Sequence, residues 1–472
     1  MFKRLYYSIF SKQTIINIFI SIFIYMIIMY FGLVNIKRSN ISQEFYMLSL
    51  MFFIWSFIEL LTKKDDYHIL FLYLLGFPVQ QWFIAKDVLI GVHLNIFLLN
   101  YNLLFVAVFF IKIVKEKGWV IRKIDGKFII SMFCCIILSI ISIRNSTFIY
   151  LAVNGVLYGL LVPFIFFLIV VNMLRTEYDV KIMYEVIFIN LLFHIIFVLL
   201  LEGTDLIYVG FGGERYTGIF GNSLFLAPLI IIFCLISLYN NFYSNRIIYI
   251  VAYVIGVFTF LFLGSRGALI CFSIAMILWI FSIPKYNKTL TKFLLVITVS
   301  IIVLLNIDIR SILENYQFIT LSRTYYKGLV DSTRYMIWES TIEYIKNNNL
   351  IFMGVGIGNY YYNEVVAWST SAHSAFLNMS SEIGVVGAVL YHYILVSQIR
   401  FMSFFSKKNI FIVFPSIILI VLLIYINVVG YEIIYHLREV EKIKSVNTHI
   451  VTIYLWLILG IAYSVNRISK NK

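Results

Sequence analysis

Hydrophobic runs of about 20 residues follow one another along almost the whole chain, and this feature constrains the fold most. A bilayer core about 30 Å thick needs about 20 apolar residues per helical crossing, and in lipid only helices and closed barrels satisfy their own backbone polar groups. The chain of 472 residues is 62% hydrophobic and 13% charged, whereas soluble domains are about half apolar and a quarter charged. The sequence therefore predicts an all-α, polytopic transmembrane bundle of about 14 spans, with residues 1–472 forming one integral membrane domain.

Polar or charged breaks between the apolar runs set the expected boundaries of the spans. Spans are expected at 14–34, 43–62, 67–85, 88–111, 128–143, 149–171, 183–201, 218–239, 247–263, 267–283, 289–307, 374–397, 409–429 and 449–465. The first run follows several basic residues, is too long for a signal-peptide core and lacks a small-residue cleavage site. It is therefore expected to be an uncleaved first span.

The distribution of Lys and Arg among the short loops predicts the orientation of the chain. Cytoplasmic loops carry an excess of these cations, and the densest group lies between Lys112 and Lys127. This places both termini in the cytoplasm and makes the protein a multi-pass protein of the cytoplasmic (inner) membrane. The net charge of +14 is spread over these loops rather than gathered on one face, so it does not indicate nucleic-acid binding. All four cysteines fall inside predicted spans, where packing is their expected role.

The long connection at 308–373 is expected on the outer face, and a loop of this length is normally functional or disordered. Helical spacing of apolar residues argues against disorder. The residues that carry this spacing are Tyr335, Trp338, Ile342 and Ile345. They predict an amphipathic helix along the outer membrane surface, capped by Asp331 or Ser332 and with Arg334 in its first turn. This helix is expected to roof a cavity among the spans.

Four stretches on the predicted outer side combine glycines with charged or polar residues. They are ERYTGIFGN at 214–222, GSRGA at 264–268, Arg334 with Gly354, Gly356 and Gly358, and Ala372-His373-Ser374 followed by Glu382-Ile383-Gly384. With Asn447-Thr448-His449 before a last span that contains Trp456, their order and spacing resemble the O-antigen polymerase and O-antigen ligase family of polysaccharide membrane enzymes. The resemblance covers residues 200–465. It implies an enzyme that acts on lipid-linked glycans at the outer face of the membrane.

Three arginines are the candidate substrate-binding residues: Arg215, Arg266 and Arg334. Arg266 sits between two apolar runs, where a charge costs several kcal/mol unless it reaches water or meets an anion. Guanidinium donors fit phosphate oxygens bidentately and stay charged at any working pH, so a lipid diphosphate is the expected ligand. The alternatives are snorkelling of Arg266 to the interface, pairing of Arg215 with Glu214 in a solvated loop, and exposure of Arg334 to water.

His373, at the end of the long loop, is the candidate catalytic base. An imidazole with an unperturbed pKa near 6.5 can accept the proton of an acceptor sugar hydroxyl. That hydroxyl would attack the anomeric carbon of the donor sugar, and the diphosphate would leave with inversion of configuration. Arginines that neutralise the leaving group make a metal or another cofactor unnecessary. The alternative role for His373 is that of an interfacial or capping residue.

Other polar residues carry weaker signals. The remaining histidines lie at cytoplasmic or midspan positions or lack the surrounding motif, and these are His68, His93, His194, His392, His436 and His449. No Cys/His cluster has metal-ligand spacing, and Glu202 with Asp205 is the one acidic pair that could hold a divalent cation. The glycines at 354–358 predict a tight turn rather than a nucleotide site. Asn378 and Glu382 could order His373 or a sugar, or join helices.

Together these features predict a metal-independent membrane glycosyltransferase. It would polymerise undecaprenyl-diphosphate-linked oligosaccharide repeat units on the outer face, for O-antigen, capsule or exopolysaccharide. The expected partners are the lipid-linked donor and acceptor, the bilayer and a chain-length regulator. One alternative is a ligase that transfers the glycan to another acceptor. The second is a flippase for the lipid-linked unit, although the halves show no convincing repeat of the kind common in transporters.

Overall fold

The structure is a computed structural model that describes residues 12–36, 43–63, 65–86, 91–118, 125–202, 223–261, 266–282, 332–360, 362–366, 369, 371–400, 410–430, 434–436, 446–448 and 450–470. The chain divides into two compact units. Unit 1 comprises 1–118 and 172–260, and unit 2 comprises 119–171 and 261–472. The expectation that residues 1–472 form one membrane domain stays a prediction.

Unit 1 is a group of long apolar helices. They are α2 (Lys12–Ile36), α3 (Gln43–Thr62), α4 (Asp66–Lys86), α5 (Gly91–Lys117), α9 (Glu177–Glu202), α10 (Ser223–Ser244) and α11 (Ile247–Leu261). Helix α4 packs against α2, α3, α5 and α9, and every side chain from Ile69 to Leu75 is buried. A helix that is apolar on all sides is stable only when other helices surround it or lipid does. Helix α4 is therefore the central helix of this unit.

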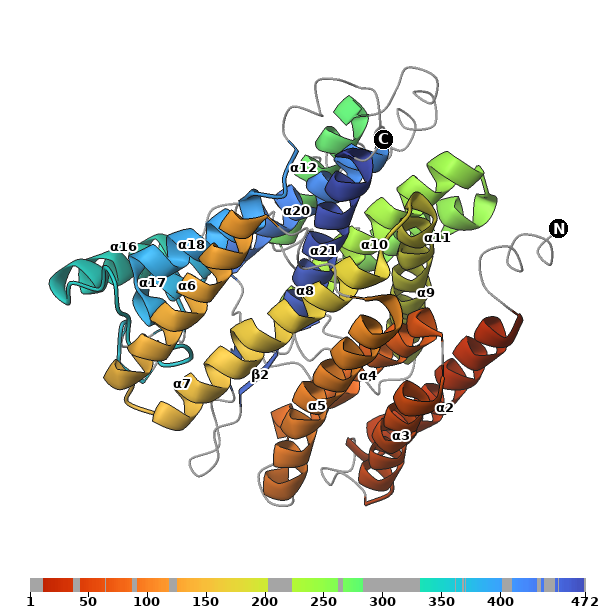
Figure 1. Ribbon diagram of the computed structural model, residues 1–472, viewed down its shortest axis with the longest axis horizontal. Coiled ribbons are helices and arrows are strands. Elements are labelled where there is room, and N and C mark those ends of the chain that lie inside the picture. The colour runs from red at the N-terminus through yellow and green to blue at the C-terminus, as the bar shows by residue number, and fades with distance from the viewer. Residues whose placement is uncertain are drawn as a thin grey trace, which may run out of the picture. The chain divides into compact units, whose positions relative to one another are not determined.

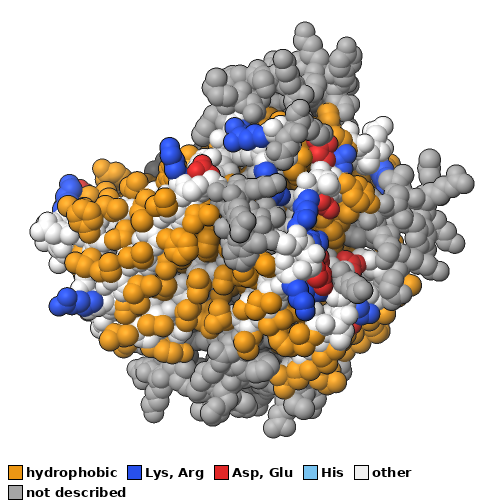
Figure 2. Space-filling model, viewed as in Figure 1, with side chains coloured by type: hydrophobic (Ala, Val, Ile, Leu, Met, Phe, Trp, Pro, Cys, Tyr) orange, Lys and Arg blue, Asp and Glu red, His pale blue; other side chains and the backbone are white. Residues whose placement is uncertain are grey.

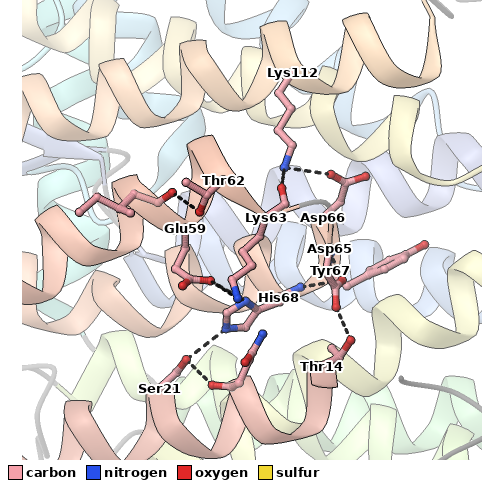
Figure 3. A network of polar contacts seen from close by, with 12 residues as sticks. Thr14, Ser21, Glu59, Thr62, Lys63, Asp65, Asp66, Tyr67, His68 and Lys112 are labelled. Carbon is pink, nitrogen blue, oxygen red and sulfur yellow. Dashed lines mark hydrogen bonds and ion pairs between the residues drawn. The ribbon is translucent and has the colours of Figure 1, made fainter. Parts of the chain in front are cut away.

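A buried polar network joins α2, α3, α4 and α5 near the start of α4 (Figure 3). The side chain of His68 is fully buried, with Nε2 3.2 Å from Ser21 Oγ and Nδ1 3.7 Å from Glu59 Oε2. Asp66 is also buried and forms an ion pair of 2.7 Å with Lys117. Buried charges are tolerated only when they are paired, so the Asp66–Lys117 ion pair joins α4 to α5, while the contact of His68 with Ser21 joins α4 to α2.

Unit 2 holds the remaining helices and two π-helical segments, η3 and η6. The elements are α6 (Gly126–Ser142), η2 (Ile143–Asn145), α7 (Ile149–Val156), η3 (Leu157–Leu161), α8 (Val162–Met173), α12 (Arg266–Ser282), α16 (Ser332–Asn347), α17 (Ala375–Ile383), α18 (Val385–Val396), α20 (Ile410–Ile424), η6 (Tyr425–Gly430) and α21 (Ile450–Lys470). Helix α21 is almost completely buried. A Cβ atom at its Gly460 would lie 2.8 Å from Val170 Cγ1, so this glycine permits close packing against α8.

Helix α6 shows how unit 2 meets lipid. Its exposed apolar side chains recur at helical spacing and are Ile130, Phe133, Ile137, Ile140 and Ile141. Figure 2 shows a broad field of apolar side chains on the face of the molecule that it views. Large contiguous apolar patches are rare on soluble monomers and mark surfaces that contact protein or membrane, so this face of α6 is suited to contact with hydrocarbon.

Five helical segments in the described parts of the chain are long and apolar enough to cross a membrane. They are Gly126–Asn145, Ile149–Met173, Leu226–Ser244, Ile410–Val428 and Val451–Lys470, and shorter apolar helices accompany them. This confirms a helical integral membrane protein. The total of about 14 spans stays a prediction, and the span expected at 289–307 lies outside the described residues.

The strands β1 (Ile434–His436) and β2 (Val446–Thr448) form an antiparallel pair. Tyr435 is opposite Asn447, and His436 is opposite Val446. This short pair is a local exception to the predicted all-α fold, and it contains two residues of the Asn447-Thr448-His449 stretch.

The expectation of one continuous span at 374–397 is wrong, because the chain reverses direction at Gly384. Helices α17 and α18 have nine and twelve residues, too few to cross a core about 30 Å thick at 1.5 Å per residue. The rings of Phe376 in α17 and His392 in α18 are 5.2 Å apart, whereas in a straight helix they would be about 24 Å apart. The two helices thus form a hairpin that packs beside α6 (Figure 1).

The helix expected in the long loop exists as α16, Ser332–Asn347, with Arg334 in its first turn as predicted. Ile337 and Thr341 of this helix are buried against the protein, while Tyr335 and Ile342 of the predicted apolar face are exposed. The placement of that face along the outer membrane surface stays a prediction. The end of the long loop builds its own apolar cluster against the buried face of α16. The cluster contains Ile337, Leu350, Val355, Tyr360, Val365, Val366 and Ala372. This part of the loop is therefore a packed structure rather than a flexible connection.

Candidate functional site

The π-helical segment η6, at the end of α20, is the structural centre of the candidate site. Short π-helical segments occur frequently at functional sites, and the last carbonyls of any helix lack partners within the helix. Two consecutive residues of η6, Asn427 and Val428, bond to other elements. These bonds bring together segments that are far apart in the sequence.

Arg334 is held against η6 by its guanidinium group. Its Nη1 donates a hydrogen bond of 2.7 Å to the carbonyl oxygen of Val428. That bond satisfies one of the orphan carbonyls at the end of η6. The backbone of the first turn of α16 is therefore separated from η6 by no more than the length of the Arg334 side chain.

His373 lies immediately before α17 in a left-handed backbone conformation, with φ of 50°. Its amide donates to Ser371 Oγ at 3.3 Å, and the preceding amide of Ala372 donates to Asn378 Oδ1 at 2.7 Å. Asn378, which was expected either to order His373 or to join helices, thus holds the loop just before His373. Non-glycine residues in this conformation cost about 1–3 kcal/mol and concentrate at functional sites.

Asn427 of η6 binds the start of α17, the helix that follows His373. Its Oδ1 accepts a hydrogen bond of 2.9 Å from the amide of Phe376, three residues after His373. The side chain of Asn427 also contacts Nε2 of His392. Arg334 and the first turn of α17, which begins two residues after His373, are consequently bonded to adjacent residues of η6.

Helix α12, which begins at Arg266, runs antiparallel to α20. Trp279 near the end of α12 contacts Phe414 near the start of α20, with ring centroids 5.6 Å apart. Helix α12 also packs against η6. The start of α12, and with it the backbone of Arg266, therefore lies at the η6 end of α20.

Three helix N-termini, those of α12, α16 and α17, gather at η6. The amides at a helix N-terminus carry a partial positive charge and favour anions, although in α17 the Phe376 amide is already bonded to Asn427. Arg266 and Arg334 add two full positive charges to the first turns of α12 and α16. The site is therefore suited to a strongly anionic ligand.

The glycines at 354–358 supply the turn that was predicted for them, and they support α17 from its other end. The amides of Val355 and Gly356 donate to the carbonyls of Ser381 and Glu382 at 2.9 and 2.8 Å. A Cβ atom on Gly354 would lie 2.2 Å from the Glu382 carbonyl carbon, so only glycine fits there. These bonds satisfy the last carbonyls of α17, and they explain the glycines without a nucleotide.

Tyr360, directly after this turn, has its hydroxyl 2.7 Å from Thr341 Oγ1. Thr341 donates to the Ile337 carbonyl in its own helix, so Tyr360 is the donor to Thr341. Burial raises the pKa of the Tyr360 hydroxyl well above its usual value. Tyr360 therefore stays protonated and joins the turn to α16.

Several sequence candidates lie outside the described residues or outside this site. Arg215 and Asp205 lie outside the described residues, as does the side chain of Arg266. Among the described residues, no group of three or more His, Cys, Asp or Glu side chains could hold a metal ion. Two residues of the site, His392 and Asn427, carry no distinctive sequence signal, because His392 lies at a midspan position and Asn427 is a single Asn in an apolar run.

The helices and the packed loop define the class of protein, a polytopic helical membrane protein with an arginine- and histidine-bearing site at a π-helical segment. Residues 251–392 match the family model described as O-antigen ligase. The matched segment includes Arg266, Arg334 and His373, and it confirms the resemblance to the O-antigen polymerase and ligase family. The search of curated proteins found no match. The family match supports a membrane enzyme that processes glycans on lipid-linked substrates.

Proposed function

We propose that the protein polymerises undecaprenyl-diphosphate-linked oligosaccharide repeat units on the outer face of the cytoplasmic membrane. The observation that carries this proposal is the convergence at η6 of three helix N-termini, two of them bearing Arg266 and Arg334 and the third preceded by His373. Such an arrangement suits a diphosphate leaving group with a proton acceptor beside it.

In this mechanism His373 removes the proton from the attacking hydroxyl of the acceptor sugar. The new glycosidic bond forms at the anomeric carbon as the bond to the lipid diphosphate breaks, with inversion. Arg266, Arg334 and Arg215 stabilise the charge that develops on the diphosphate. The proton moves to the His373 imidazole, and no metal ion takes part.

A ligase is the second candidate, and the family description itself favours it. A ligase would use the same donor chemistry but transfer the glycan to a different acceptor, such as a lipid core or a protein. A flippase for the lipid-linked unit would leave the anomeric bond intact.

Polymerisation is tested by incubating the purified protein in liposomes with one lipid-diphosphate-linked repeat unit and EDTA, and resolving the products on a gel. We expect a ladder of lengthening lipid-linked glycans, lost in His373→Ala and Arg266→Ala. Arg266→Lys should restore little, because a lysine lacks the bidentate donors of arginine.

A matched control is Thr259→Val, since the Thr259 hydroxyl bonds only to the Ile255 carbonyl of its own helix among the contacts described. It should keep the full ladder. Label that appears only on an added second acceptor would favour the ligase. Substrate that crosses the bilayer unchanged would favour the flippase, and either result would overturn the polymerase.

A further inference from the structure

The hydrogen bonds of Asn427 and His392 assign a role to a pair of residues that sequence motifs do not mark. We propose that Asn427 caps α17 from another helix and that His392 orients Asn427 for this task, so that the pair positions His373. The capping of α17 does not depend on the proposed function, whereas the predicted effect on catalysis rests on it.

Helix α17 lacks the local cap that its sequence offers. Ser374 occupies the N-cap position with an extended backbone, but its side chain makes no capping hydrogen bond. The amide of Phe376, in the first turn, donates instead to Asn427 Oδ1 at 2.9 Å. An asparagine from η6 therefore performs the function that a Ser, Thr, Asp or Asn usually performs from within the helix.

The orientation of the Asn427 amide follows from its partners. The Phe376 amide can only donate, so the atom facing it is Oδ1. The carbonyl of Leu423 can only accept, and it lies 2.9 Å from Nδ2. Together these two partners determine which end of the Asn427 amide is oxygen and which is nitrogen.

The hydrogen bonds of His392 fix its tautomer in the same way. Its Nδ1 lies 2.9 Å from the carbonyl oxygen of Ala388, which can only accept, so Nδ1 carries a hydrogen. In the neutral ring Nε2 is then an acceptor, and it lies 3.2 Å from Asn427 Nδ2. His392 thus accepts the second hydrogen of Nδ2 and keeps Oδ1 directed at the start of α17.

The same pair connects His373 to Arg334. The next residue after Asn427, Val428, accepts the hydrogen bond from the Arg334 guanidinium, and the ring of His392 packs edge-on against Phe376. A displacement of about 1 Å in a catalytic group can lower a rate about 100-fold. His392 and Asn427 are therefore positioning residues, which act through α17 and not on the substrate.

The test compares Asn427→Leu, His392→Phe and His392→Gln in the liposome assay. The Phe variant keeps a ring against Phe376 but has no acceptor for Nδ2, whereas Gln offers an amide oxygen as a substitute acceptor. We expect Asn427→Leu and His392→Phe to lower kcat about 10- to 100-fold with little change in the donor KM. His392→Gln should recover most of the rate, and the double variant Asn427→Leu/His392→Phe should be no worse than Asn427→Leu alone.

Hydrogen–deuterium exchange of the peptide that contains Phe376 gives a readout independent of activity. Its exchange should become about tenfold faster in Asn427→Leu and His392→Phe, stay slow in His392→Gln, and remain unchanged in Thr259→Val. Unchanged exchange in His392→Phe would overturn the proposal, as would a full rate in Asn427→Leu. If the wild-type protein forms no ladder, the polymerase is refuted, and the exchange result alone decides whether the pair caps α17.

Discussion

At the scale of single residues, the backbone conformation of His373 allows a catalytic role of its side chain to be distinguished from a role in stability. Its φ of 50° is a conformation that costs a residue with a Cβ atom about 1–2 kcal/mol and costs glycine nothing. We predict that His373→Gly loses the glycan ladder yet unfolds at a temperature equal to or above that of His373→Ala, which keeps the strain. Thermal unfolding of the purified variants, together with the gel assay, measures both effects. A full ladder in His373→Gly would exclude this residue as the base.

The sequence marks His373 and Arg334 as candidates but does not mark the residues that contact their surroundings at η6. A histidine among glycines at the end of a loop and an arginine in a first turn are unusual in an apolar chain, so both stand out. Asn427 and His392 lie inside apolar runs, where a lone polar residue usually joins packed helices. Their role depends on a contact between positions 376 and 427, and no local pattern encodes such a contact.

At the scale of elements, Gly384 is the corner on which the hairpin of α17 and α18 depends. Its φ is 89°, and a Cβ atom there would lie 2.8 Å from the carbonyl carbon of Phe352. We predict that Gly384→Ala lowers the free energy of unfolding by about 2–4 kcal/mol and abolishes activity, because α17 loses its place. Gly126→Ala is the control, since nothing lies within 4 Å of a Cβ atom there. Equal melting temperatures for the two variants would show that the corner is not strained.

Most helices were predictable because lipid imposes the same demand on every span, and α2, α3, α4 and α21 begin within two residues of the predicted positions. The hairpin was not predictable, since two short apolar helices joined at a glycine have the same hydropathy as one continuous span. The signal that was present lay in the polar residues Asn378 and Glu382, which are costly in a lipid-facing helix. In the structure both are buried, and the side chain of Asn378 bonds to the amide of Ala372, just before α17.

At the scale of the whole molecule, the charge distribution predicts on which side of the membrane the site works. The short loops that would be cytoplasmic carry most of the Lys and Arg residues, with the densest group between Lys112 and Lys127. This bias normally sets the orientation of a polytopic protein. It places both termini inside and the long loop at 308–373 outside. A lipid-linked donor is then required on the outer face, where nucleotide sugars are absent.

This orientation is tested by cysteine labelling in a variant without Cys134, Cys135, Cys234 and Cys271. All four are free, and all lie in helices, so their replacement by Ala or Ser should leave activity intact. With a membrane-impermeant maleimide, we predict that Glu314→Cys in the long loop is labelled in intact cells and that Lys472→Cys is labelled only after permeabilisation. The opposite pattern would place the long loop in the cytoplasm. The site at η6 would then face nucleotide-sugar donors, and a polymerase of lipid-linked units would no longer be consistent with the topology.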